Sequence, residues 1–249
     1  MKTCYAGDEL RGVSYLMRIV SRKYCEARLA LSRWHSGLVL LLLFPIFAVS
    51  DADLASFERQ LLSRYGSSAA YIAGEFRVML GEQASSPVAE KLDVVNHFFN
   101  SRIRFSDDQQ TWGKHDFWAS PGETIGRGAG DCEDFTIAKY VALKLLGIPE
   151  EKLRLTYVKA QLSSVAGVPS QAHMVLTYYE TPSSEPLVLD NLRAEVLPAS
   201  RRPDLEPVFG FNSKGLWVGA RTGSTGHDPL ARVSRWRDVL QKIRSEGLD

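Results

Sequence analysis

The sequence predicts an α+β fold in which helices come first and a small antiparallel sheet follows. From residue 51 to about 82 apolar residues recur at helical spacing, and another helical pattern follows Cys132. After residue 150 the pattern changes to short runs rich in Leu, Val, Thr and Tyr, which are typical of strands. A chain of 249 residues, 45% of them hydrophobic, is long enough to bury a full core. We therefore expect one domain in which the helix that starts at Cys132 packs on the sheet.

The first 50 residues differ from the rest and are typical of a secretory signal. Basic residues precede an apolar run of 13 residues at 37–49, and small residues lie directly before Asp51. A membrane-spanning helix usually needs about 20 apolar residues, so an uncleaved anchor is the less favoured alternative. The basic segment is long, and translation from Met17 would shorten it to an ordinary length. The expected organisation is a signal peptide at 1–50 with a long basic n-region, followed by an exported domain at 51–249.

Cleavage after Ser50 would change both the charge and the cysteine content. It removes seven of the 30 basic residues and three of the 29 acidic residues, which leaves a net charge of −3. This balance gives no reason to expect nucleic acid as a partner. Cys4 and Cys25 are lost as well, so Cys132 remains as the only cysteine and has no partner for an internal disulfide. A lone exported cysteine is either a small buried hydrophobe or a reactive thiol.

Three helices are expected before Cys132. The pattern at 51–82 is divided near Gly66, and a third helix follows Pro87 and fades into Phe105. Between residues 106 and 130 the periodicity disappears, and we expect a long loop without regular structure. Such a loop inside a compact domain is usually functional.

A strong helix begins at the cysteine, and strands follow it. Asp131 is a good N-cap, which places Cys132 in the first turn, and Gly147 with Pro149 supplies a stop. Later runs predict four strands, at 153–158, 172–179, 187–189 and 216–219, and a closing helix at 233–243.

Cys132 lies where a thiol is readily activated. The free N–H groups of a first helical turn carry partial positive charge, which favours the thiolate. A thiol nucleophile also needs a base within hydrogen-bond reach, and the base needs a partner that orients it. His173 starts one expected strand and Asp190 ends another, so adjacent strands would bring their side chains together. The chain order Cys, His, Asp on a helix and two strands is the papain-like arrangement.

Three carboxylates, those of Asp131, Glu133 and Asp134, adjoin the cysteine in sequence. Their negative charge opposes thiolate formation, and a hard divalent cation with oxygen ligands would neutralise it. Calcium tolerates irregular loops better than magnesium does. The alternative is structural, because acidic residues in a first turn complement the helix dipole and Asp131 with Asp134 resembles a capping arrangement. The residues alone favour that alternative.

Four segments make the indication more specific: DFWASPGETIGRGAGDCEDFTIAKYVALKLLGIPEEKLRL, AHMVLTYYE, PLVLDNL and FNSKGLWVG. They resemble the bacterial transglutaminase-like cysteine proteinases of the LapG type, from about residue 90 to 220 and more loosely from 51 to the end. The GDCEDF block with its AHMVL and LVLDN partners is highly specific. The resemblance implies a papain/transglutaminase-like cysteine protease fold. It also implies that Cys132, His173 and Asp190 occupy the family's catalytic positions.

The same resemblance implies properties that the residues do not show. It implies a calcium cofactor, with Asp131 and Glu133 at ligand positions and Asp134 as a further candidate. It implies a periplasmic location, which agrees with the signal. The implied substrate is a large cell-surface adhesin that is cleaved near its N-terminal end at a di-alanine site, which disperses biofilm. The implied inhibitor is an inner-membrane receptor of the LapD type that holds the protease when cyclic di-GMP is bound inside the cell.

Two other functions are compatible with these features. An enzyme of the same fold that passes the acyl group to an amine would be a transglutaminase or amidase, and mass analysis of product ends would separate it from a hydrolase. A non-catalytic periplasmic module would use the cleft only to hold a peptide, but a pure binder has no need of an intact triad. Trp112, Trp118 and Trp217 are candidates either for a substrate groove or for packing, and Trp112 is also a candidate oxyanion donor.

Overall fold

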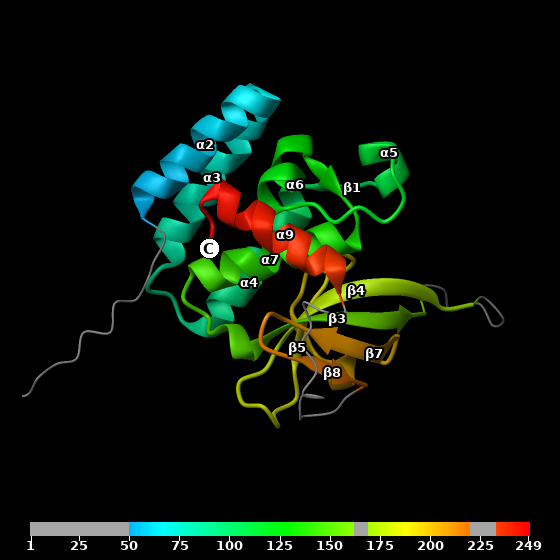
Figure 1. Cartoon of the computed structure of the whole chain (residues 1–249). Helices are drawn as coiled ribbons and strands as arrows, with labels where there is room; N and C mark the ends of the chain where they lie inside the picture. Colours follow the sequence, from blue (N-terminus) through cyan, green and yellow to red (C-terminus); the bar gives the residue numbers. More distant parts are fainter. Residues whose placement is uncertain (1–49, 162–168, 220–232) are drawn as a thin grey trace, which may run out of the picture. The chain divides into compact units, whose positions relative to one another are not determined.

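A computed structural model describes residues 50–161, 169–219 and 233–249 of the chain (Figure 1). The predicted signal peptide, apart from Ser50, lies outside these residues. Within the described ranges no helix is both long enough and apolar enough to cross a bilayer. Mixed helices and an antiparallel sheet confirm the predicted α+β class.

The first three described helices agree with the expected ones: α2 (Asp51–Tyr65), α3 (Ser67–Gln83) and α4 (Val88–Arg102). Gly66 separates α2 from α3 with a φ of +88°, a conformation that glycine adopts without strain. The three helices share a core of phenylalanine rings, in which Phe76 contacts Phe57, Phe98 and Phe99 at centroid distances of 6.4, 5.8 and 5.9 Å. This core anchors α4, whose polar face reaches the candidate site.

The expected long loop at 106–130 is wrong, because the segment contains regular structure. It holds two short helices, α5 (Asp108–Trp112) and α6 (Pro121–Arg127), and the strand β2 (Ala129–Gly130), which pairs in parallel with β1 (Arg104–Phe105). In this segment the capping residues, and not the hydrophobic periodicity, indicate where the helices begin. The Asp107 side chain accepts from the backbone N–H of Gln110, while Ser120 and Glu123 form a reciprocal capping box. Helices of five and seven residues are too short to display an amphipathic pattern.

Helix α7 (Cys132–Leu145) lies at the centre of the domain, as expected. Ile137, Ala138 and Tyr140 are fully buried, and the helix contacts α4, α6 and the sheet strands β3 and β4. A helix surrounded in this way keeps its first turn in a fixed position, and that turn carries Cys132.

The main sheet has six strands in the order β6-β5-β4-β3-β7-β8, all antiparallel. Its strands are β3 (Leu153–Ala160), β4 (Gln171–Tyr178), β5 (Leu187–Leu189), β6 (Leu197–Pro198), β7 (Leu205–Phe211) and β8 (Leu216–Val218). Four of these match expected strands, but β6 and β7 were not expected. The sequence of β7 does not read as a strand because it contains Pro207 and Gly210, and both residues are unfavourable inside strands.

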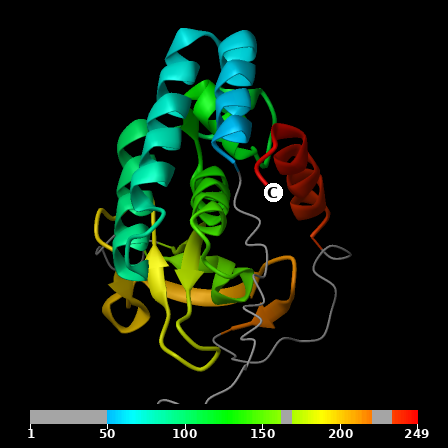
Figure 2. The same ribbon diagram turned by 90° about the vertical axis from the view of Figure 1, so that its left-hand side faces the viewer.

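The described helices lie on one side of this sheet (Figures 1 and 2). Two 3₁₀ turns, η1 (Glu150–Lys152) and η2 (Ala199–Arg201), flank strands, and α9 (Ser234–Glu246) closes the chain close to its expected position. Leu155, Met174 and Leu176 face the main core with α7, whereas Val158, Val175 and Val188 form a smaller cluster. Since side chains alternate along a strand, this smaller cluster lies on the opposite face of the sheet.

Candidate active site

Cys132 is the first residue of α7, and the helix fixes it against β4. The Thr136 hydroxyl, one turn further on, bonds to two backbone carbonyls, that of Cys132 at 2.8 Å and that of Met174 at 3.1 Å. Met174 follows His173 in β4. The first turn of the helix is thereby tied to the strand at the residue next to the candidate base.

The Cys132 thiol is partly buried and donates to Glu133 Oε2 at 2.7 Å. Burial raises the pKa of the thiol well above its ordinary value, and the Glu133 carboxylate raises it further, while a backbone hydrogen bond from Met174 acts in the opposite direction. Among the described residues, no hydrogen bond joins the thiol to His173. The negative charge of Glu133 therefore opposes formation of the thiolate.

His173 and Asp190 are brought together as the sequence predicts. Strand β4 pairs with β5, with Leu176 opposite Leu189. The start of β4 and the residue after β5 therefore lie side by side at the same end of these two neighbouring strands. His173 Nε2 is 2.9 Å from Asp190 Oδ1, and both side chains are buried. Because Nε2 is engaged by Asp190, Nδ1 is the nitrogen left to exchange a proton with a reacting group.

Asp190 is held at both carboxylate oxygens. Oδ1 also accepts the backbone N–H of Leu192 at 3.0 Å, and Oδ2 accepts Arg202 Nη2 at 2.7 Å. Burial by itself would raise the pKa of Asp190, but the bonds from His173, Leu192 and Arg202 outweigh it and hold the pKa well below its ordinary value. Asp190 is therefore ionised throughout the physiological range, as an orienting carboxylate must be.

Polar residues of α4 and α7 that the sequence analysis did not single out fix the loop after Asp190. Asn100 Nδ2 donates to the Asp190 carbonyl at 2.8 Å, and Asn96 Nδ2 donates to the carbonyls of Arg193 and Ala194 at 3.1 and 3.0 Å. The buried Lys139 ammonium donates to Asn96 Oδ1 at 2.8 Å. These residues carry one signal in the sequence, since amides and a lysine on otherwise apolar helix faces are rarely buried without a structural partner.

A second cluster of carboxylates adjoins the thiol and contains Asp108, which the sequence analysis did not identify. Ligand atoms of Asp108, Asp131 and Asp134 lie within 4.8 Å of one another, and so do those of Asp131, Cys132 and Glu133. The cluster opens onto a surface hollow that Gln109, Gln110 and His115 also line. Asp108 opens helix α5, which lies inside the expected loop, so only the fold reveals that it faces Asp131.

The cluster fits a hard divalent cation. Asp108 Oδ1 and Asp131 Oδ1 are buried and accept no hydrogen bond from any described residue. Burial raises the pKa of Asp131 to about 9, and the charges of Glu133 and Asp134 add to this effect. Burial likewise raises the pKa of Asp108. Carboxylate oxygens that lack donors and resist ionisation are stabilised by a bound cation, and an all-oxygen set suits calcium.

Asp134 differs from Asp131 because both of its carboxylate oxygens accept hydrogen bonds. Oδ1 accepts the backbone N–H of Ala119 at 2.7 Å, and Oδ2 accepts that of Asp131 at 3.4 Å. Burial raises its pKa to about 7. Asp131 and Asp134 form the reciprocal capping box of α7, so the structural alternative applies to both residues. It does not account for the buried Oδ1 atoms of Asp131 and Asp108, which have no partner among the described residues, and the role of Asp134 as a cation ligand stays a prediction.

The three tryptophans pack against other side chains. Trp118 is 4% exposed and stacks on Phe211, with centroids 5.9 Å apart. Trp112 lies against Phe117 at 4.6 Å, and Trp217 lies under the Arg154 guanidinium at 4.2 Å. These contacts favour packing over a substrate groove.

A cysteine that opens a central helix, tied to a strand whose histidine pairs with an aspartate after the neighbouring strand, defines a cysteine hydrolase of the papain and transglutaminase class. Comparison with known proteins gives the family. The chain belongs to the bacterial transglutaminase-like cysteine proteinases, whose family model matches residues 75–203. No curated protein matches the chain.

Solved structures of LapG from Legionella pneumophila are similar to this fold. The calcium-bound structure is 35% identical with a TM-score of 0.66, and it is matched over 76% of this chain and 98% of its own. The EGTA-treated structure is 37% identical, also with a TM-score of 0.66, over 76% of this chain and 97% of its own. The predicted LapG-type family and fold are thus confirmed.

Proposed function

We propose that this protein is a calcium-dependent periplasmic endopeptidase in which Cys132 is the nucleophile, His173 the base and Asp190 the residue that orients it. The observation that carries the proposal is the buried His173–Asp190 pair, in which His173 belongs to β4, the strand to which the first turn of α7 is tied. Membership of the proteinase family supports peptide hydrolysis as the reaction.

The chemistry follows from which atoms are engaged. Asp190 binds His173 Nε2, so Nδ1 takes the thiol proton as Cys132 Sγ attacks a substrate carbonyl carbon and forms the S–C bond. The oxyanion that develops accepts the backbone N–H of Cys132, which is free at the start of a helix. Nδ1 then gives its proton to the leaving nitrogen as the C–N bond breaks, and water hydrolyses the thioester by the reverse proton path.

We propose calcium as the cofactor, held by Asp108, Asp131 and Glu133. Buried oxygens of Asp108 and Asp131 that lack a donor among the described residues support this assignment, as does the calcium-bound structure of Legionella LapG. When bound, the cation supplies positive charge that balances the carboxylates beside the thiol. The chain's own part is to place Glu133 Oε2 at 2.7 Å from Sγ, where its charge matters most to the nucleophile.

We propose that the substrate is the N-terminal region of a large cell-surface adhesin, cut at a di-alanine site, so that cleavage releases the adhesin and disperses biofilm. We propose an inner-membrane LapD-type receptor that responds to cyclic di-GMP as the inhibitory partner. Similarity to LapG supports both proposals, and the signal-like segment at 1–50 supports the periplasmic location.

The test is cleavage of a purified adhesin N-terminal fragment by residues 51–249, with calcium, with chelator, and with Cys132→Ala. Cutting that needs calcium and is lost in Cys132→Ala supports the nucleophile and the cofactor together. Cutting that survives chelation contradicts the cofactor assignment. An amine-linked product identified by mass analysis would indicate a transglutaminase or amidase, and no cutting under any condition would favour a peptide-binding module.

The partner and the location need separate measurements. Cell fractionation is expected to place the mature protein, cleaved before Asp51, in the periplasm, and an intact N-terminus in the membrane fraction contradicts this. The receptor's periplasmic domain is expected to retain the protease when the full-length receptor is loaded with cyclic di-GMP. Equal retention without the nucleotide contradicts the proposed control.

A further inference from the structure

Arg202 is a buried cation that the proposed mechanism does not use, and it touches Asp190 directly. The side chain is 3% exposed. Its Nη2 donates to Asp190 Oδ2 at 2.7 Å and to Asp204 Oδ2 at 2.8 Å, while Nε donates to Asp204 Oδ1 at 3.0 Å. Asp204, Arg202, Asp190 and His173 thus form one continuous chain of charged hydrogen bonds.

This chain fixes the plane of the Asp190 carboxylate. Oδ1 is used by His173 and by the Leu192 N–H, so Arg202 is the side-chain donor at Oδ2. A carboxylate bonded through only one oxygen can rotate about its terminal torsion, which is broad in carboxylate side chains. With both oxygens bonded, the direction of the bond to His173 Nε2 is set, and with it the direction in which Nδ1 points.

Asp204 in turn prevents Arg202 from moving. It bonds to two nitrogens of the guanidinium, which is the bidentate geometry that orients arginine most strongly. Burial would lower the pKa of Arg202, but the bonds to Asp204 and Asp190 outweigh it and raise the pKa above its ordinary value. Arg202 is therefore a permanent cation of fixed orientation.

The other buried cation in this region does not replace it. The Lys139 ammonium bonds to Asn96, and burial lowers its pKa to about 7 although the charge of Asp190 opposes this. Lys139 therefore contributes a partial charge without a described hydrogen bond to the Asp190 carboxylate, and Arg202 remains the residue that defines the carboxylate plane.

We propose that Arg202, held by Asp204, is a positioning residue that orients Asp190 and through it His173 for the reaction at Cys132. The inference rests on the proposed function and adds to it the groups that align the base. Arg202 does not touch the thiol or the substrate, so its effect is expected on the chemical step and not on substrate binding.

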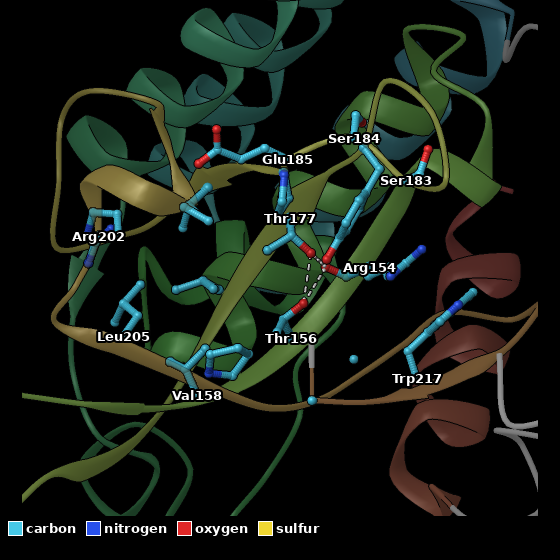
Figure 3. A pocket seen from close by; sticks show the side chains of 18 residues that line it. Arg154, Thr156, Val158, Thr177, Ser183, Ser184, Glu185, Arg202, Leu205 and Trp217 are labelled. Carbon is cyan, nitrogen blue, oxygen red and sulfur yellow. Dashed lines mark hydrogen bonds between the residues drawn. The ribbon is translucent and has the colours of Figure 1, made fainter. Parts of the chain in front are cut away.

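A cavity beside Arg202 makes the proposal testable by chemical rescue. Arg202 lies at one end of the lining of a cavity of about 410 Å³ on the sheet face opposite α7, and Trp217 lies at the other end (Figure 3). Arg202 Nη1 has no hydrogen-bond partner among the described residues. Truncation to Arg202→Ala leaves a gap that adjoins this cavity and is lined by the carboxylates of Asp190 and Asp204, into which methylguanidinium fits.

The experiment measures kcat and KM for adhesin-fragment cleavage by the mature protein and by Arg202→Ala. We expect kcat to fall about 100-fold with KM nearly unchanged, since misalignment of a reacting group by about 1 Å costs this much. Methylguanidinium is expected to raise the kcat of Arg202→Ala at least about tenfold. Tetramethylammonium, which has no N–H donor, is expected to leave it unchanged. Arg201→Ala, a change at the exposed neighbouring arginine, is the matched control and is expected to behave as the native protein.

Two further measurements keep the proposal decidable. If Arg202→Ala does not fold, Arg202→Lys and Asp204→Asn take its place, and both are expected to lower kcat by about tenfold, because an ammonium lacks the guanidinium fork and a freed Arg202 loses its orientation. The proton NMR signal of His173 Nε2–H, assigned by its loss in His173→Gln, reports positioning without substrate. It is expected to shift in Arg202→Ala and to return with methylguanidinium.

The outcomes separate this inference from the proposed function. A native protein that does not cleave, but whose His173 signal responds to Arg202→Ala and to rescue, contradicts the substrate and leaves the positioning role supported. A folded Arg202→Ala with native kcat and an unchanged His173 signal overturns the positioning role. Equal rescue by both cations also overturns it, because that result indicates a general effect of charge.

Discussion

Asp190 and Asp131 both lie in the candidate active site, and the protein surrounds their carboxylates in opposite ways. Asp190 accepts hydrogen bonds from His173, Leu192 and Arg202, so its charge is balanced within the protein and its pKa is lowered. Asp131 has a buried oxygen without a donor among the described residues, and its pKa is raised to about 9. The same chemical group is therefore bonded by donors of the protein at both oxygens of Asp190, and left without a described donor at one oxygen of Asp131.

Because of this difference, the two regions depend on different things: one on the residues of the fold, and the other on the cations in solution. The His173–Asp190–Arg202 chain is complete without any added group, so its geometry depends on residues of the fold alone. Asp108, Asp131 and Glu133 line one surface hollow, and Glu133 places a negative charge next to the thiol. We therefore expect the state of this region to depend on the cations that the solution supplies. Substitutions that remove a carboxylate from one region or the other test this comparison directly.

The largest effect is expected from Asp190→Asn. The amide removes the charge that His173 faces and presents a donor at one of the two positions where Asp190 now accepts hydrogen bonds, which disturbs the tautomer and the direction of the imidazole. We expect kcat to fall on the order of 10³–10⁴-fold, as for the loss of an orienting carboxylate in other triads. Steady-state cleavage with calcium in excess measures it. Asp93→Asn, an exposed change on α4, is the matched control, and a loss below tenfold in Asp190→Asn contradicts the triad.

Calcium should stabilise the native protein, and Asp131→Asn should remove most of that effect. A ligand present at 100 times its Kd stabilises by about 2.7 kcal/mol, which corresponds to a rise in Tm of about 5–10 °C for a domain of this size. Loss of a ligand is expected to weaken calcium binding at least about 100-fold, since even outer-shell changes cost 10–100-fold. Thermal unfolding with calcium and with EGTA measures both effects.

Asp108→Asn is the second arm of the same experiment, because it tests a ligand that only the fold reveals. It is expected to weaken calcium binding as Asp131→Asn does, while Asp93→Asn retains the full rise in Tm. If Asp108→Asn binds calcium as tightly as the native protein does, Asp108 is not a calcium ligand. An equal rise in Tm for the native protein and both variants would contradict the whole cluster as the calcium site.

The sequence was most informative where chemistry and local pattern coincide. The N-cap Asp131 and the periodicity after it predict that Cys132 begins a helix, and two recognisable strands predict the His173–Asp190 contact. The resemblance to a known family then gave the fold. Each of these signals lies within a short segment, so no long-range contact had to be known in advance.

The parts that could not be predicted depend on short elements that leave no periodic pattern in the sequence. Asp108 meets Asp131 because the short helix α5 turns back toward β2, and Arg202 meets Asp190 across a segment that includes the unexpected strand β6. The segment ASRRPD, which contains Arg202, has the composition of an exposed turn. Only the fold shows that Arg202 is buried while its neighbour Arg201 is exposed.

Glu246 provides a reference for the comparison, since it is a buried carboxylate far along the chain that neutral donors alone bind. It accepts the Ser120 hydroxyl and the Gly122 N–H, the latter at 3.1 Å, and burial raises its pKa from 4.5 to about 7. The folded state then binds the proton more tightly than the unfolded state. The contribution of Glu246 to stability is therefore full below about pH 4.5 and is lost as the pH rises through about 7.

Glu246→Gln should remove this pH dependence. Relative to the variant, the native protein is expected to lose up to about 3 kcal/mol of unfolding free energy between pH 4.5 and pH 8. Urea unfolding of both proteins at several pH values measures it, with Glu90→Gln, a change at an exposed glutamate of α4, as the control. If the native protein and Glu246→Gln show parallel pH profiles, hydrogen bonds from neutral donors are enough to keep a buried carboxylate ionised, and the contrast with Asp190 no longer depends on Arg202.

The smallest effect is expected from Asp134→Asn, which separates a capping carboxylate from a cation ligand. The amide retains the bond from Ala119 but turns an N–H₂ group toward the Asp131 N–H, which loses its acceptor, and about 1–2 kcal/mol of stability is expected to be lost. Calcium titration should show less than a tenfold change in affinity, against the much larger loss in Asp131→Asn. If instead both variants lose calcium equally, Asp134 is a third carboxylate ligand. Its bonds to Ala119 and Asp131 then serve to aim it at the cation, and the division between a compensated and an uncompensated set shifts to include it.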